Sequence, residues 1–332
     1  MTQLRIGVLG AARIAPSALV RPAGKVPGAV VSAVAARDPE RARRFAAKHG
    51  IPTVHAGYQE LLDDPDVDAV YNPLPNALHA EWTLKAIAAG KHVLCEKPFT
   101  SNAAEARAVA DAAKGSGLVV MEAFHYRYHP MAARMREIVD SGELGTVRSV
   151  ETAMCFPLPT FGDIRYSYPL GGGALMDGGC YALHLLRLLG GEAQGAPEVV
   201  SAAATLRSPD VDRAMTAELR FAGGASGRIT ASMWSRKLLD FTARVRGDAG
   251  ELKVTNYLAP QLFNRLTVRT AAGTRKERVA GGQTYTYQLR AFVEAVLNDG
   301  PVLTPAEDAV LTMGLIDDIY RAAGMRPRGG TD

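Results

Sequence analysis

Short apolar runs alternate with amphipathic stretches through the first third of the chain. Each run has the length of a buried strand, and the stretches between them repeat apolar residues at helical spacing. Asp38 before Pro39 is typical of a helix N-cap, because its side chain can accept hydrogen bonds from the first backbone N–H groups. Alternating strands and helices predict a parallel sheet covered on both faces. The predicted strands are residues 5–9, 30–35, 53–55, 69–72, 92–95 and 118–122, and the predicted helices are residues 38–49, 58–62, 77–89 and 102–114.

The pattern changes at about Tyr126, where longer strand-like runs follow one another with glycine-containing turns between them. Consecutive strands joined by short turns are typical of an antiparallel sheet. The predicted strands are residues 147–155, 199–206, 214–221, 226–233, 241–246 and 265–269, with helices at 131–140, 178–189, 286–297 and 305–323. We therefore predict an α/β protein, with an N-terminal doubly wound parallel sheet and a C-terminal α+β domain on a broad, mostly antiparallel open sheet.

Composition and charge narrow the function classes. Of the 332 residues, 47% are hydrophobic and 22% are charged, as in an ordinary globular enzyme with room for two cores. The formal charge of +4 is small, and the densest basic group (Arg41, Arg43 and Arg44) is interpreted as a solvated helix face, so nucleic acid is not an expected partner. Three cysteines without paired spacing argue against disulfides and metal. No apolar run approaches about 18 residues, so we expect a cytoplasmic protein with no membrane partner.

A turn of small residues follows the first predicted strand. It reads Gly10-x-Ala12-x-x-Ala15, a variant of the dinucleotide fingerprint in which small residues let the backbone approach a pyrophosphate. Because alanine stands at two of the three positions, an ordinary strand-to-helix turn remains an alternative. The helix that follows has free N–H groups that can bind phosphate, which favours a nucleotide site. We assign residues 1–124 to a dinucleotide-binding Rossmann domain and residues 125–332 to a domain for substrate binding and oligomerisation.

The end of the second predicted strand indicates which dinucleotide is preferred. An NAD enzyme usually places a carboxylate here against the ribose 2′-hydroxyl, whereas this chain has the uncharged Ala36 followed by Arg37. A planar guanidinium pairs well with a 2′-phosphate. The alternative is that Arg37 is a surface residue and Asp38 binds the ribose. Asp38 already has a role as the N-cap before Pro39, so we expect NADP, with NAD less favoured.

Two further segments place polar clusters directly after apolar strands. Residues 69–79 end in Pro73-Leu74-Pro75-Asn76 and His79, and residues 90–98 end in Glu96-Lys97-Pro98. In a doubly wound sheet this is the carboxyl edge, where ligands bind.

These motifs together resemble the glucose–fructose oxidoreductase and inositol dehydrogenase (Gfo/Idh/MocA) family. The second half extends the resemblance through Gly162–Tyr166 and through the segment from Gly171 to Tyr181, so that it covers essentially the whole chain. It is similar to the branch that holds dimeric dihydrodiol dehydrogenases, xylose 1-dehydrogenases and sugar-nucleotide 3-ketoreductases. The inositol dehydrogenase branch usually has histidine where this chain has Tyr181, and the position four further on is Leu185, which argues against inositol oxidation by a histidine base.

The resemblance implies roles for individual residues. Lys97 is expected to touch the nicotinamide ribose and the substrate oxygen, Tyr181 to be the proton donor or acceptor, and Asp177 to orient substrate or cofactor, or merely to cap its helix. His79 is expected to contact the cofactor or to pack its helix. Arg165 is expected to reach a phosphate or substrate, or to pair with Asp163. The cofactor residues implied are Gly10, Ala11, Ala12, Arg13, Ile14, Arg37, Tyr58, Asn72, Pro73, Leu74, Asn76, His79, Glu96, Lys97 and Arg165.

The implied chemistry is hydride transfer between nicotinamide and a carbon–oxygen centre. The alkoxide formed on reduction must be protonated, and a neighbouring ammonium lowers the pKa of a phenol, ordinarily near 10, toward a working range. We expect an NADP-dependent oxidoreductase acting on a sugar or cyclic diol, as a homodimer or homotetramer joined through the second-domain sheet. A sugar-nucleotide 3-ketoreductase is one alternative. A non-catalytic NADP-binding regulator is another, and it would need neither Lys97 nor Tyr181.

Overall fold

The computed structural model describes residues 3–160, 162–234 and 238–329, and the chain forms two compact units. The first unit comprises Met1–Tyr128 and Thr284–Val310, and the second comprises His129–Gln283 and Leu311–Asp332. The sequence-based division after residue 124 differs in two respects, because the first unit extends to Tyr128 and because Thr284–Val310 groups with it. None of the helices in the described part of the chain has the length and apolar character needed to span a bilayer.

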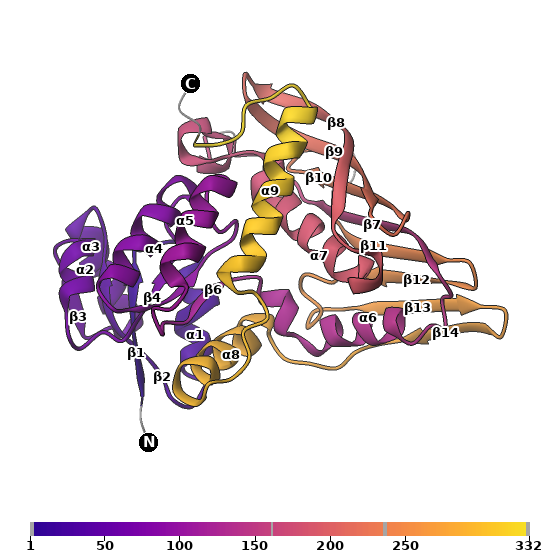
Figure 1. Cartoon of the computed structure of the whole chain (residues 1–332). Helices are drawn as coiled ribbons and strands as arrows, with labels where there is room; N and C mark the ends of the chain where they lie inside the picture. Colours follow the sequence, from indigo (N-terminus) through magenta and orange to yellow (C-terminus); the bar gives the residue numbers. More distant parts are fainter. Residues whose placement is uncertain (1–2, 161, 235–237, 330–332) are drawn as a thin grey trace. The chain divides into compact units, whose positions relative to one another are not determined.

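The first unit contains a parallel sheet with helices on its faces (Figure 1). In the described residues its strand order is β3-β2-β1-β4-β5-β6, so the order reverses beside β1, as in a doubly wound fold. The strands are β1 (Leu4–Leu9), β2 (Ala29–Ala35), β3 (Thr53–His55), β4 (Ala69–Asn72), β5 (His92–Cys95) and β6 (Val120–Glu122). The helical segments are η1 (Pro16–Val20), α1 (Arg21–Ala23), α2 (Pro39–His49), α3 (Tyr58–Asp63), η2 (Asn76–Leu78), α4 (His79–Ala88), α5 (Ala103–Ala113), η3 (His125–Tyr128) and α8 (Thr284–Asn298).

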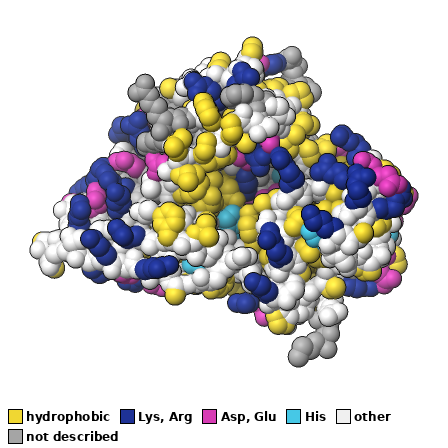
Figure 2. All heavy atoms as spheres, turned by 180° about the vertical axis from the view of Figure 1, so that it is seen from behind, with side chains coloured by type: hydrophobic (Ala, Val, Ile, Leu, Met, Phe, Trp, Pro, Cys, Tyr) yellow, Lys and Arg dark blue, Asp and Glu magenta, His cyan; other side chains and the backbone are white. Residues whose placement is uncertain are grey.

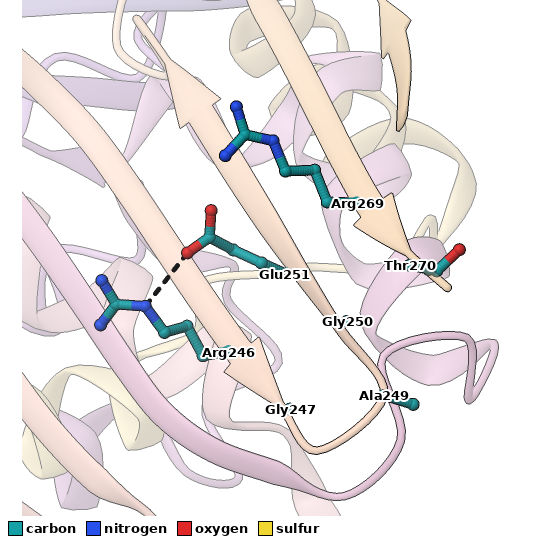
Figure 3. A pocket seen from close by; sticks show the side chains of 7 residues that line it. All are labelled: Arg246, Gly247, Ala249, Gly250, Glu251, Arg269 and Thr270. Atoms are coloured by element: carbon teal, nitrogen blue, oxygen red, sulfur yellow. Dashed lines mark hydrogen bonds and ion pairs between the residues drawn. The ribbon is translucent and has the colours of Figure 1, made fainter. Parts of the chain in front are cut away.

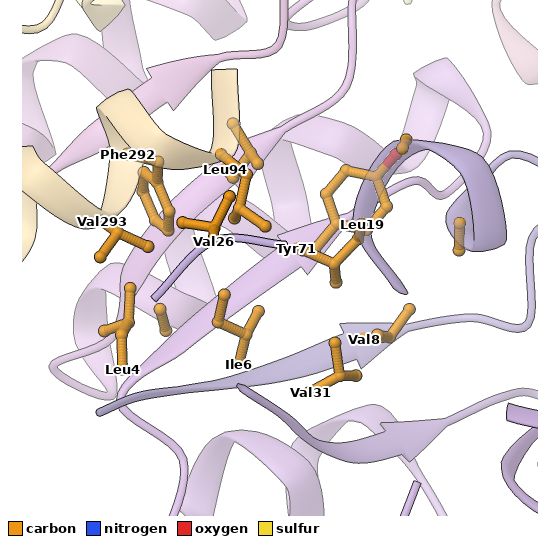
Figure 4. Close-up of a cluster of buried hydrophobic side chains, with 14 of the residues drawn as sticks. Leu4, Ile6, Val8, Leu19, Val26, Val31, Tyr71, Leu94, Phe292 and Val293 are labelled. Carbon is orange, nitrogen blue, oxygen red and sulfur yellow. The ribbon is translucent and has the colours of Figure 1, made fainter. Parts of the chain in front are cut away.

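The core of this unit explains why α8 belongs to it. Ile6 and Val8 of β1 are fully buried, as expected of a central strand covered on both faces. Phe292 and Val293 of α8 pack into the same cluster, close to Leu94 (Figure 4). Burying one such side chain contributes roughly 1.5–3 kcal/mol. The amphipathic pattern of residues 286–297 predicts the helix but not the sheet on which its apolar face packs.

The second unit is built on a mostly antiparallel sheet. Its order in the described residues is β14-β13-β12-β11-β7-β10-β9-β8, with β7 antiparallel to β11 and parallel to β10. The strands are β7 (Val147–Cys155), β8 (Pro197–Ser208), β9 (Val211–Phe221), β10 (Ser226–Ser232), β11 (Asp240–Gly247), β12 (Gly250–Thr255), β13 (Arg265–Thr270) and β14 (Gly273–Glu277). The helical segments are α6 (Pro130–Asp140), η4 (Ile164–Tyr166), η5 (Tyr168–Leu170), η6 (Leu175–Gly179), α7 (Cys180–Gly190) and η7 (Glu192–Gln194). Helix α9 (Ala306–Ala322) begins in the first unit and ends in the second.

The two faces of this sheet differ in character. Helix α7 contacts β7 and β10 on one face, where Val150, Ile229 and Val245 are fully buried. Side chains of the opposite face form cross-strand ion pairs, with Arg246 bonded to Glu151 at 2.5 Å and to Glu251 at 3.0 Å. Alternate positions on these strands therefore carry charged side chains on the face opposite α7.

Candidate functional site

The turn after β1 brings several predicted cofactor residues together. Gly10 has φ of +96°, a conformation that L side chains rarely adopt, and its N–H donates to the carbonyl of Ala35 at 2.6 Å. A Cβ at Gly10 would lie 3.1 Å from Leu74 Cδ2 and 3.8 Å from Tyr58 Oη. The backbone of this turn therefore lies beside two side chains that the sequence also assigned to the cofactor. Such a tight cradle, next to the start of a helical segment, fits a pyrophosphate.

Asn72 and His79 are buried, and their hydrogen bonds hold the loops at the carboxyl edge of the parallel sheet. Asn72 is fully buried, and its amide nitrogen donates to the His79 carbonyl and to Thr83 Oγ1, each at 3.2 Å. The His79 ring lies between two backbone carbonyls, with Nδ1 2.8 Å from Pro98 O and Nε2 2.7 Å from Leu74 O. The ring thus links the loop after β4 to the loop after β5. Burial lowers the pKa of His79 to about 4, while the hydrogen bonds to the two carbonyls oppose this shift and the charge of Lys97 adds to it. Both residues hold the loops at this edge, and their contact with the cofactor stays a prediction.

Lys97 lies two residues after the end of β5 and is half-buried. Its neighbour Glu96 accepts a 2.6 Å hydrogen bond from the hydroxyl of the buried Tyr71. Burial is the main reason that the pKa of His125 falls to about 3, and the charge of Lys97 adds to this. The charge of Lys97 therefore contributes to the lowered pKa of both buried imidazoles, His79 and His125. Pro73 is buried, Asn76 is half-buried, and both lie in the loop that the His79 ring supports.

The predicted cofactor residues near the Gly10 turn differ in their exposure. Arg13, Ile14 and Arg37 are exposed, as required of groups that meet a ligand. Ala11 is 8% exposed and packs with Ala36 and Ala42, while Ala12 is half-buried. Arg41 is exposed, as the interpretation of a solvated helix face expects, and its Nη2 also donates to the Ala11 carbonyl at 2.8 Å. The sequence could have indicated this contact, because Arg41 lies in the first turn of α2, only a few residues after the end of β2.

In the second unit, the predicted acid–base residues share one helical segment. Asp177 lies in η6 and Tyr181 in the first turn of α7, four residues apart and so on the same face. Tyr181 is 4% exposed, which matches a group that works out of bulk water. Arg165 donates from Nε to Asp177 at 3.0 Å and from Nη1 to Asp163 at 3.1 Å. The pKa of Arg165 is raised, chiefly by the charge of Asp177. This cluster combines one guanidinium with two carboxylates.

Surface cavities on the sheet of the second unit lie apart from these residues. The cavity in Figure 3 has a volume of about 340 Å³ and is lined by Arg246, Gly247, Ala249, Gly250, Glu251, Arg269 and Thr270. Its lining includes none of the predicted site residues. Figure 2 shows Lys and Arg side chains distributed over the face in view, with Asp and Glu side chains among them.

The fold and the motifs together define the class of protein. A model of an oxidoreductase family with an NAD-binding Rossmann fold matches residues 4–124. A model of the GFO/IDH/MocA C-terminal domain matches residues 132–253. The chain therefore belongs to the Gfo/Idh/MocA family of oxidoreductases, which confirms the predicted family, fold class and enzyme class.

Relatives with assigned activities extend over nearly the whole chain. A D-xylose 1-dehydrogenase (NADP⁺) of Haloferax volcanii is 37% identical over 96% of this chain and 97% of its own length. A dTDP-3,4-didehydro-2,6-dideoxy-α-D-glucose 3-reductase of Streptomyces violaceoruber is 37% identical over 90% of this chain and 86% of its own length. The crystal structure of the 3-ketoreductase KijD10 of Actinomadura kijaniata, in complex with NADP and TDP-benzene, has a TM-score of 0.88 at 32% identity and covers 98% of both chains.

Proposed function

We propose that this chain is an NADP-dependent sugar oxidoreductase in which Tyr181 carries the proton and Lys97 assists it. The observation that carries the proposal is the shared helical face of Asp177 and Tyr181, with the Asp177 carboxylate held by Arg165. Bound NADP supplies or accepts the hydride at its nicotinamide ring. The Gly10 turn would hold the pyrophosphate, and Arg37 would pair with the 2′-phosphate.

We assign proton transfer, charge stabilisation and substrate orientation to three residues of this chain. In the reduction direction, the Tyr181 hydroxyl gives its proton to the oxygen on which negative charge develops, and in oxidation it accepts that proton. Lys97 donates a hydrogen bond to the same oxygen and stabilises the phenolate left on Tyr181. Asp177, kept in one orientation by Arg165, accepts a hydrogen bond from a substrate hydroxyl. Two other crystal structures of KijD10 contain a Tyr-to-Phe and a Lys-to-Ala substitution, at positions separated by the same number of residues as Tyr181 and Lys97, which supports the choice of this pair.

For the substrate we favour an uncharged sugar over a nucleotide-linked one. The cluster of Arg165, Asp163 and Asp177 has one positive and two negative charges, and it would repel the phosphates of a nucleotide. The likeness to the dTDP-sugar reductases favours the nucleotide-linked alternative. The test is a turnover screen with NADP⁺ and NADPH over D-xylose and other aldoses, inositols, cyclic diols and dTDP-linked keto-sugars. We expect turnover of a free aldose or diol; turnover of the dTDP-sugar alone would reverse the choice, and turnover of none would reject the function.

The proton-transfer roles are tested by Tyr181→Phe, Lys97→Ala and the double variant. Each single change should lower kcat by about 10²–10⁴, or roughly 3–5 kcal/mol, because one proton donor or one charge is lost from the same step. The double variant should be far less impaired than the product of the two losses, as expected of residues that act together. Lys85→Ala and Tyr287→Phe are matched controls on helices of the first unit and should leave kcat unchanged. A near-normal kcat for Tyr181→Phe would remove Tyr181 from the mechanism.

A further inference from the structure

A fully buried arginine lies near the end of the chain in the second unit. Arg328 has no exposed surface, and its Nε donates to the Gly172 carbonyl at 2.7 Å. Its Nη1 donates to the carbonyl of Arg326 at 3.0 Å, and its Nη2 donates to Asp212 Oδ1 at 3.1 Å. The guanidinium also lies 4.1 Å from the centre of the Tyr320 ring. Such complete burial of a charge requires a partner charge and several hydrogen bonds, which these contacts supply.

The partner carboxylate of Asp212 extends this network to the start of the η6 segment. Asp212 is also fully buried, and its Oδ1 accepts a second hydrogen bond, from the Tyr320 hydroxyl at 2.9 Å. Its Oδ2 accepts a 2.7 Å hydrogen bond from the backbone N–H of Leu175. Leu175 is the first residue of η6 and lies two positions before Asp177. The ion pair therefore holds the chain on both sides of Gly173, through Gly172 O and Leu175 N.

Gly173 shows how closely the chain approaches this network. Its φ of +140° suits glycine, and a Cβ there would lie 2.7 Å from Tyr320 Oη and 2.8 Å from Arg328 Nη2. The backbone of Gly173 in turn contacts the proposed site residues. Its N–H donates to the Arg165 carbonyl at 2.8 Å, and its carbonyl accepts from the Asp177 N–H at 3.0 Å. A continuous set of contacts thus runs from Arg328 to the two residues that form the Arg165–Asp177 pair.

We propose that Arg328 is a positioning residue for the reaction, acting with Asp212 to hold the 172–175 turn in the conformation that orients Asp177 and Tyr181. This proposal rests on the proposed function of those two residues. The network spans 116 positions of sequence between Asp212 and Arg328, and it ties the segment after α9 to the turn before α7. A displacement of about 1 Å in a catalytic group costs as much as 10²-fold in rate, so loss of this support should appear in kcat.

The test is Arg328→Ala, which leaves a space of the size of a guanidinium ion. We expect kcat to fall by about 10- to 100-fold, while the dissociation constant of NADPH, measured by fluorescence titration, stays within about twofold because the cofactor is held mainly by the first unit. Guanidinium chloride at low, non-denaturing concentration should restore part of kcat, whereas equal concentrations of sodium chloride should not. Arg326→Ala is the matched control, because Arg326 lies two residues away, pairs with Asp210 at the surface and should leave kcat unchanged.

A second readout separates this proposal from the proposed function. Hydrogen exchange measured by mass spectrometry should show faster exchange at the amides of Leu175 and Asp177 in Arg328→Ala, but not in Arg326→Ala. Asp212→Asn keeps the shape of the side chain and should show the same change if Arg328→Ala does not fold. Unchanged exchange and unchanged kcat in a folded Arg328 or Asp212 variant would overturn the positioning role. Failure of the wild-type enzyme to turn over any sugar would instead reject the proposed function, while the exchange result would still decide whether the network holds the turn.

Discussion

The carboxylate of Asp38 is already engaged by the backbone at the start of α2. Its Oδ1 accepts hydrogen bonds from the N–H groups of Glu40 and Arg41, at 3.0 and 3.3 Å. This confirms the predicted N-cap, and it leaves Asp38 less suited to bind a ribose 2′-hydroxyl. Arg37, directly before it, is exposed, and Arg41 lies against the Gly10 turn. Two guanidinium groups therefore lie on the side where the second strand ends.

We predict that Arg37→Ala weakens NADPH binding by about 10- to 100-fold and NADH binding little, because a charge-assisted hydrogen bond to the 2′-phosphate contributes about 1.5–3 kcal/mol. Arg41→Ala should shift binding in the same direction but less, since part of its role is to hold the Ala11 carbonyl. Fluorescence titration of both cofactors against both variants measures the effect. Arg43→Ala is the control, because Arg43 pairs with Glu40 at the surface. Equal losses for the two cofactors would contradict a 2′-phosphate contact.

The role of His79 shows what a sequence motif does not distinguish. Its place in the Pro-x-x-x-His loop led us to favour contact with the cofactor. In the structure it is 1% exposed and both ring nitrogens lie against carbonyls of the two loops. The structure shows how His79 packs, and its contact with the cofactor stays a prediction, because the spacing alone does not distinguish the two.

Among the elements, α6 and β14 are joined by a carboxylate between two arginines. Glu277 accepts from Arg134 at 2.8 and 2.9 Å and from Arg275 at 2.7 Å. The hydrogen bonds from Arg134, and then those from Arg275, lower the pKa of Glu277 from 4.5 to about 2. A carboxyl with a lowered pKa in the folded state stabilises the fold above its unfolded pKa, and this stabilisation is lost as the pH falls from about 4.5 toward 2.

We therefore predict that Glu277→Gln lowers the free energy of unfolding at neutral pH by about 1 kcal/mol. The difference between wild type and variant should shrink as the pH is lowered from about 5 to about 2, because the wild-type carboxyl is then protonated. Thermal unfolding across this pH range measures it. Glu137→Gln, which removes a more exposed partner of Arg134, should change stability less. A pH-independent difference would show that the charge of Glu277 is not what stabilises this contact.

For the molecule as a whole, the charged face of the second-unit sheet is the surface through which we expect two copies to associate. Glu151 on β7 lies in register with Arg228 on β10 and Arg244 on β11, so charges of opposite sign alternate across the strands. Such a surface can pair with a second copy through polar contacts that weaken as salt rises. The homodimer joined through this sheet stays a prediction.

We predict a homodimer at micromolar concentration, joined through this sheet face. Glu151→Arg should convert it to a monomer, because the sheet faces of the two copies would then both carry an excess of positive charge and repel each other. Light scattering or sedimentation measures the mass, and added salt should weaken the wild-type dimer. Glu307→Arg, on the exposed first turn of α9, is the control and should not change the mass. A wild-type monomer at micromolar concentration would reject the prediction.

Local signals explain why so much of the chain was predictable. Strands β3, β4, β5 and β7 have the predicted bounds, since short apolar runs between polar turns allow few alternatives. Strands β12 and β14 were not predicted. Their alternating or charged residues resemble turns and surface loops, and only pairing with β11 and β13 makes them strands. The segment of residues 178–189 was predicted to be one helix, whereas the structure begins it earlier, with η6 at Leu175.

By itself, the sequence determined most of the elements, the Gly10 turn, the Asp38 cap and, through its motifs, the family. These features depend on residues a few positions apart, whose propensities and spacing act locally. The tertiary structure alone decided that β7 lies between β10 and β11, that α8 packs on the parallel sheet, and that Asp212 pairs with Arg328. The physical reason is that a local pattern shows which face of an element will be buried. Burial of apolar area is non-directional, so the pattern does not show which distant partner will cover that face.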